Sequence, residues 1–221
     1  MVDIFDEISD DLRTERAVAL ARRYGGLLIV LLVLVLVGVG AQQAWRWHET
    51  QRNDKAATEF LALTSRIGQA GPNLTDPQRV QDAKSLAEFA ATAPSGYKTL
   101  AEFRAAALYS DAGQAARAEA LWTDIGRDDN ADPLLRELAN LLWAQHALGT
   151  APDQEVLARL KPLEALSNPY HGLAQETQAL VYLHEGKTGL AKALFSQLAS
   201  DPAAPEGVRN RANGLLAQLN G

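Results

Sequence analysis

The side chains that most often carry out chemistry are sparse in this chain and do not form a catalytic or metal-binding pattern. None of the histidines falls in an H-x3-H or H-E-x2-H pattern typical of zinc sites; they are His48, His146, His171 and His184. No serine stands in a G-x-S-x-G context, and neither a Walker loop nor a G-x-G-x2-G sequence is present. We therefore expect no catalytic residue, no cofactor and no metal site.

One acidic loop has residues of the type that bind cations. Asp128, Asp129 and Asp132 lie close together, but the spacing of an EF-hand and its closing glutamate are missing. Asp132 is followed by Pro133, and an aspartate before a proline is a typical helix start. We therefore interpret this loop as a solvent-exposed turn that caps the next helix.

The composition excludes several other classes of protein. The chain has 221 residues and a net charge of −6, so it lacks the basic surface of a nucleic-acid-binding protein. It contains no cysteine, which excludes disulfides, zinc thiolates, a thiol nucleophile and an acylated lipoprotein anchor. After residue 45 it is rich in alanine and leucine and poor in β-branched residues, which favours an all-α fold.

Two stretches of this helical region repeat each other. Ala106-x2-Tyr109-x3-Gly113-x4-Ala118-x3-Trp122 has the same spacing as Ala179-x2-Tyr182-x3-Gly186-x4-Ala191-x3-Phe195. Small residues let two antiparallel helices approach, glycine permits the turn between them, and the aromatic residues fill the space between pairs. This spacing fits the tetratricopeptide pattern, so we expect an α-solenoid of divergent helix pairs.

The repeats depart from the general pattern in two ways. The unit between them, about residues 132–168, keeps Gly149 at the turn but has Gln145 where the others have tyrosine. Both full units lack the early tryptophan and leucine of the tetratricopeptide pattern. A plain helical bundle is therefore the alternative fold.

A scaffold of this kind binds partners through the concave face that is lined by the first helix of each pair. Counting from the matched positions gives a candidate groove with an apolar floor and acidic rims, made of Leu100, Phe103, Ala107, Asp111, Leu173, Glu176, Leu180 and His184. Such a groove suits an amphipathic or extended segment of another protein. The alternative is that Phe103 and Leu180 are core residues covered by a neighbouring helix.

An apolar segment from Tyr24 to Trp45 precedes the repeats and carries no charge. About 22 residues of helix span roughly 33 Å, which is enough to cross a membrane. Arg22 and Arg23 stand at one end, and Trp45 and Trp47 stand at the other, where aromatic rings suit the lipid headgroups. We predict a tail over residues 1–23, a membrane anchor over residues 24–45, and a repeat domain over residues 46–221.

The orientation and fate of the anchor follow from its flanks. The N-terminal flank carries four arginines, with an adjacent pair at the boundary, which favours a cytoplasmic N-terminus. A cleaved signal peptide is the alternative, because Val39-Gly40-Ala41 has the small residues of a cleavage site. The acidic tail and the long apolar core favour a retained anchor.

The layout resembles a bacterial family, the ancillary subunits of the SecYEG protein-export translocon (YfgM-like). The similarity extends through YKTLAEFRAAALYSDAGQAARAEALW and NPYHGLAQETQALVYLHEGKTGLAKALF, and includes the Trp45-Arg46-Trp47 boundary. The resemblance implies an inner-membrane protein whose repeat domain lies in the periplasm. It also implies association with the translocon and with a membrane-anchored periplasmic chaperone of the prolyl-isomerase type.

The sequence thus predicts a non-enzymatic, membrane-anchored interaction module that assists protein export. Its expected partners are the SecYEG translocon, that chaperone and membrane lipid, and no nucleic acid is expected. An anchored adaptor in cell-envelope assembly or cytochrome maturation is the alternative function.

Overall fold

The computed structural model describes residues 4–221, with side chains for all of these except residues 4–25, 27–29 and 72. The chain divides into two compact units, residues 1–54 and residues 55–221. Helix α1, Ile4–Ala70, contains the whole described part of the first unit and begins the second. The charged side chains of the predicted tail and of its arginine pair lie outside the described residues.

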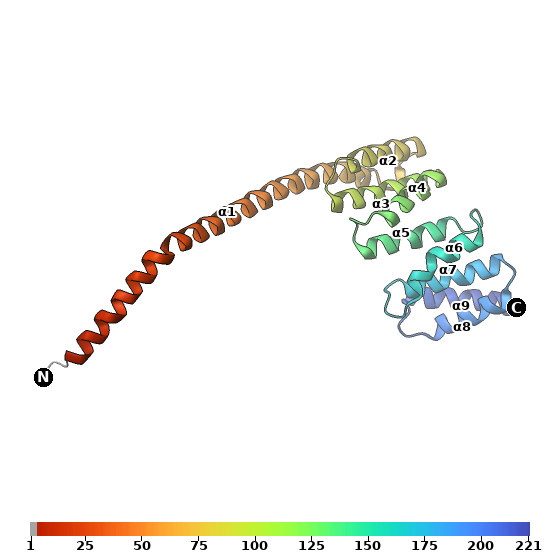
Figure 1. The fold of residues 1–221 in the computed structure, drawn as a ribbon. Coiled ribbons are helices and arrows are strands. Elements are labelled where there is room, and N and C mark those ends of the chain that lie inside the picture. The colour runs from red at the N-terminus through yellow and green to blue at the C-terminus, as the bar shows by residue number, and fades with distance from the viewer. Residues whose placement is uncertain (1–3) are drawn as a thin grey trace. The chain divides into compact units, whose positions relative to one another are not determined.

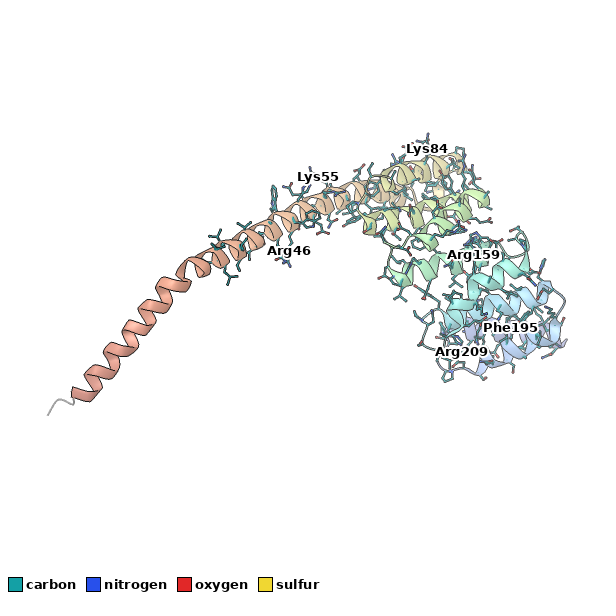
Figure 2. All side chains as sticks on the ribbon, in the orientation of Figure 1. Arg46, Lys55, Lys84, Arg159, Phe195 and Arg209 are labelled. Atoms are coloured by element: carbon teal, nitrogen blue, oxygen red, sulfur yellow. The ribbon has the colours of Figure 1, made fainter. Side chains whose placement is uncertain are left out.

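The described part of the first unit is a helix with exposed apolar side chains from Val30 onward. Its valines and leucines from Val30 to Val37, together with Val39, are each 50 to 64% exposed, and Trp45 and Trp47 are also exposed. Figure 2 shows the side chains around Arg46 projecting outward on α1. In the described residues, this helix is the one long and apolar enough to cross a membrane. The predicted anchor boundaries at residues 24 and 45 stay a prediction.

The second unit is a stack of helices, and residues 4–221 contain no strand. After the end of α1 the elements follow one another with short turns, and Figure 1 shows the helices stacked from α2 at one end to α8 and α9 at the other. The elements are η1 Gly71–Asn73, α2 Asp76–Ala90, α3 Ser95–Asp111, α4 Ala115–Arg127, α5 Pro133–His146, α6 Asp153–Leu160, η2 Lys161–Glu164, α7 His171–His184, α8 Thr188–Ser200 and α9 Glu206–Asn220. This arrangement confirms the all-α fold of stacked helix pairs.

The helix ends follow local sequence signals. Gly113, Gly149 and Gly186 adopt φ values of +70°, +78° and +75° at the turns, which is a conformation that side chains with a Cβ disfavour. The Asp132 carboxylate accepts a hydrogen bond from the Leu134 backbone N–H at 2.8 Å and caps α5.

The start of α2 differs from the expected one by a single residue. Asp76 is followed by Pro77, the same start signal as Asp132 before Pro133, and this pattern predicts Asp76 as the cap. Thr75 is the capping residue instead, and its backbone N–H donates to Gln78 Oε1 at 2.9 Å. A glutamine three residues after a threonine makes the reciprocal capping box, and this contact favours the earlier position.

Two hydrophobic clusters hold the second unit together. The larger cluster extends from the last turns of α1 to α7, and the smaller one joins α7, α8 and α9. Ala106, Ala118, Ala179, Ala191 and Phe195 are fully buried, Trp122 and Tyr109 are buried, and Tyr182 is half-buried. Figure 2 shows Phe195 among the C-terminal helices. The alanines lie at the contacts between helices, where small side chains permit close packing.

Candidate functional site

The eight residues of the predicted groove lie on two helices, four on α3 and four on α7. On α3, Leu100 and Asp111 are exposed, whereas Phe103 and Ala107 are half-buried. Phe103 packs against the larger cluster.

On α7, Leu173 packs against both clusters and Leu180 against the smaller one. Glu176 is buried, and His184 is exposed. His184 has an intramolecular partner, because its Nδ1 lies 3.0 Å from the Asp153 carboxylate of α6. The groove itself stays a prediction, but two of its residues, Glu176 and Leu180, line a hollow.

This hollow, which we name the C-terminal hollow, has a volume of about 370 Å³ and is open to solvent. It lies between α5, α7 and α9, and its lining residues are Gln145, Leu148, Glu176, Thr177, Leu180, Arg211 and Leu215. Three leucines supply its apolar wall, and the other four residues supply polar groups. None of the four α3 residues of the predicted groove contributes to it.

A two-pronged ion pair forms one edge of the C-terminal hollow. Arg211 donates from Nε to Glu176 Oε1 and from Nη2 to Glu176 Oε2, both at 2.6 Å. The Glu176 side chain is 7% exposed and the Arg211 side chain 56% exposed, so the carboxylate is buried and the guanidinium reaches solvent. The hydrogen bond to Glu176 raises the pKa of Arg211, an effect that partial burial opposes. Arg211 therefore neutralises the charge of the buried Glu176 carboxylate, and the two hydrogen bonds fix the orientation of the Arg211 guanidinium.

Another part of the lining is uncharged. Gln145 Nε2 lies 3.5 Å from Thr177 Oγ1, a long contact, while Thr177 Oγ1 donates to the Leu173 backbone carbonyl at 2.9 Å. Gln145 is exposed, whereas Tyr109, at the same distance from its turn glycine, is buried. The hollow thus adjoins the position where the middle repeat lacks the aromatic ring.

A second hollow of about 320 Å³ lies between the C-terminal end of α1 and α2. Its lining is more polar and consists of Arg66, Ala70, Leu74, Gln78, Gln81, Asp82 and Ser85. Arg66 and the buried Asp82 form an ion pair across it, so this pair joins the first two helices of the stack.

The acidic loop after α4 has a structural role. Asp128 accepts a hydrogen bond from Lys98 Nζ at 2.5 Å, and Asp129 pairs with Arg136 at 2.9 Å. The Lys98 hydrogen bond lowers the pKa of Asp128, while burial raises the pKa of Glu102 beside them. Among the described side chains, no group of three or more metal-ligating residues comes together. The loop caps α5 through Asp132 and contacts α3 through Lys98.

Sequence reasoning missed five of the seven residues that line the C-terminal hollow. Arg211, Thr177, Leu148 and Leu215 carry no motif, and only the packing of α9 on α7 brings Arg211 to Glu176. Gln145 did carry a signal, because it departs from the aromatic residue found in both other repeats.

Comparison with known protein families gives a match. The profile of the tetratricopeptide repeat-like domain matches residues 21–213. No curated protein and no solved structure matches the chain. The matched range includes α5, α7 and the first half of α9, which are the helices around the C-terminal hollow.

Proposed function

The chain belongs to the tetratricopeptide repeat-like domain family, and we propose that it is a membrane-anchored, non-enzymatic protein-interaction module. Domains of this kind stack helix pairs into extended surfaces that bind other proteins. The candidate site has the matching chemistry, since it combines an apolar wall with a few fixed polar groups.

The exposed apolar helix carries this proposal. From Val30 to Val37 each valine and leucine side chain is at least half exposed all round the helix. Such a continuous apolar surface is unfavourable in water, at about 25 cal/mol for each Å². A lipid bilayer is the environment that covers all sides of one helix, so membrane lipid is the first partner of the chain.

The finer proposal places this module in protein export. The N-terminus would be cytoplasmic and the repeat domain periplasmic, beside the SecYEG translocon and a membrane-anchored chaperone of the prolyl-isomerase type. It is supported by the arginine pair before the apolar segment and by the resemblance of the whole layout to translocon ancillary subunits. The repeat domain would receive segments of secreted proteins or of the chaperone, without catalysing a reaction.

A charge placed in the anchor tests the membrane part of the proposal. Val35→Arg puts a guanidinium near the middle of the apolar segment, which costs about 2.5–3.5 kcal/mol of insertion free energy. We expect this variant to be released from membranes by alkaline carbonate. The matched control is Leu61→Arg, on the same helix in the second unit, which should stay in the membrane fraction. Equal extraction of the two variants would argue against the anchor.

Crosslinking in intact cells tests the partners. A photoreactive residue replaces Leu180 in the C-terminal hollow, and the same residue replaces Leu190 on α8 as a control outside it. Adducts with translocon subunits, the chaperone or nascent secreted chains, formed from position 180 only, would support the export function. Adducts with cytochrome-maturation or wall-assembly proteins would instead favour the adaptor function.

A further inference from the structure

The C-terminal hollow borders a position at which an aromatic ring is missing from the repeat pattern. In α3 and α7 a tyrosine stands four residues before the turn glycine, and both tyrosines pack against the hydrophobic clusters. In α5 this position is Gln145, whose thin, exposed side chain borders the hollow instead of filling it. The corresponding position therefore holds an apolar ring in both other repeats, and the space beside Gln145 suits an apolar side chain.

We propose that the C-terminal hollow binds an extended, uncharged peptide segment and takes up one of its large apolar side chains. This inference rests on the proposed interaction function and specifies the partner at that site. The incoming side chain would contact Leu148, Leu180 and Leu215, which replaces the contacts that a tyrosine at position 145 would make.

The charges around the hollow favour an uncharged ligand. Glu176 and Arg211 are the charged residues of the lining, and they neutralise each other in their two-pronged pair. An acidic ligand at Arg211 would approach Glu176 as well, and a basic ligand at Glu176 would meet the guanidinium. Neither gains much net attraction, so the site selects ligands by apolar contact and neutral hydrogen bonds.

The polar groups of the rim match a peptide backbone. Glu176 accepts two of the five N–H donors of Arg211, which leaves others to donate to a backbone carbonyl. Gln145, from α5, offers its amide oxygen, which can accept from a backbone N–H. An extended peptide presents both kinds of group next to its side chains, whereas a helix uses them internally.

The volume of the hollow admits side chains but not a whole helix. At about 370 Å³ it lies at the lower end of the range of ligand pockets. A helix, about 10–12 Å across with its side chains, would rest on the rim without entering.

Gln145→Tyr is the decisive variant, because it supplies the missing ring and takes up part of the space beside Leu148, Leu180 and Leu215. The full-length chain in detergent micelles is titrated into a short fluorescein-labelled peptide of glycine, serine and asparagine with one central leucine and blocked ends. Fluorescence anisotropy measures the dissociation constant. We expect Gln145→Tyr to weaken binding about tenfold or more, the factor expected from burial of one leucine side chain. Its urea midpoint should be equal to or above that of the original chain.

The matched control is Gln154→Tyr, an exposed glutamine on α6 outside the hollow, which should leave binding unchanged. A peptide with alanine in place of the central leucine should bind as weakly to the original chain as the leucine peptide binds to Gln145→Tyr.

Several results would overturn the inference. They are tighter binding of a peptide with aspartate or lysine beside the leucine, equal binding to both tyrosine variants, and the absence of binding to the original chain. Self-association that Gln145→Tyr abolishes would identify a second copy of the chain as the occupant instead. In each case the crosslinking experiment still reports independently whether the chain has a protein partner.

Discussion

Phe195→Ala removes the one aromatic ring that is fully buried in the smaller hydrophobic cluster. Phe195 is 0% exposed and lies among Ala179, Ala191, Leu198, Ala204, Val208 and Ala212. Four of these six residues are alanines, which have no rotamers with which to fill the cavity. We therefore expect the loss to lie in the usual range for buried phenylalanine, about 3–5 kcal/mol of unfolding free energy.

Two other substitutions serve as comparisons for this loss of unfolding free energy. Tyr182→Ala should cost less, roughly 2 kcal/mol, because the tyrosine ring is only half-buried. Leu190→Ala on the same helix as Phe195 should change the free energy by no more than about 0.5 kcal/mol, since Leu190 is 53% exposed. For a domain of this size, 3–5 kcal/mol corresponds to a decrease of about 6–20 °C in the melting temperature.

Urea unfolding of the full-length chain in micelles, followed by circular dichroism, measures the three variants. Hydrogen exchange adds the location, because faster exchange should be concentrated in α7, α8 and α9 while α2 to α4 keep their protection. If Phe195→Ala and Leu190→Ala shifted the midpoint equally, the packing of the C-terminal helices described above would be wrong.

Two further predictions concern turn geometry and pH. Gly186→Ala should destabilise the domain by about 1–2 kcal/mol because φ is +75° at this turn, whereas Gly214→Ala within α9 should stabilise it by about 0.5–1 kcal/mol in the same urea assay. In the Lys98→Met variant, the free energy of unfolding should fall less steeply at acid pH than in the original chain. The lowered pKa of Asp128 stabilises the fold above the unfolded value of about 3.9, and this contribution, up to about 1 kcal/mol, is lost as the pH falls through the folded pKa. An acid limb identical in the original chain and the variant would show that the Lys98–Asp128 contact carries no stability.

The sequence was most informative where a short stretch determines the outcome by itself. The turns at Gly113, Gly149 and Gly186 could be predicted because glycine at the end of an apolar helical pattern has a local physical reason. The apolar segment was equally clear, since its length and lack of charge are properties of a contiguous stretch. The cap of α2 shifted by one residue, because threonine and aspartate are neighbours and both can cap.

The candidate site was less predictable because its contacts join residues far apart in the chain. Counting along α3 and α7 gives the face of each helix but not which neighbouring helix covers it. Glu176 looked like a free acidic rim residue, yet Arg211 from α9 pairs with it. His184 looked equally free, yet Asp153 of α6 contacts it. Both partners lie more than thirty positions away, where no periodic pattern can identify them.

The order of the helices in the stack has a consequence for synthesis. Each helix from α2 onward packs mainly on its neighbours in the sequence. During synthesis, each helix pair can therefore fold onto the preceding pair before distant segments have been made. The exception is the last pair, because Val208 and Ala212 of α9 complete the cluster around Phe195. Until residues 206–220 have emerged, the apolar face of α7 and α8 stays open. A chain truncated after residue 205 would therefore expose this apolar surface near its C-terminus. Quality-control proteases would recognise such a surface as that of an incompletely folded protein.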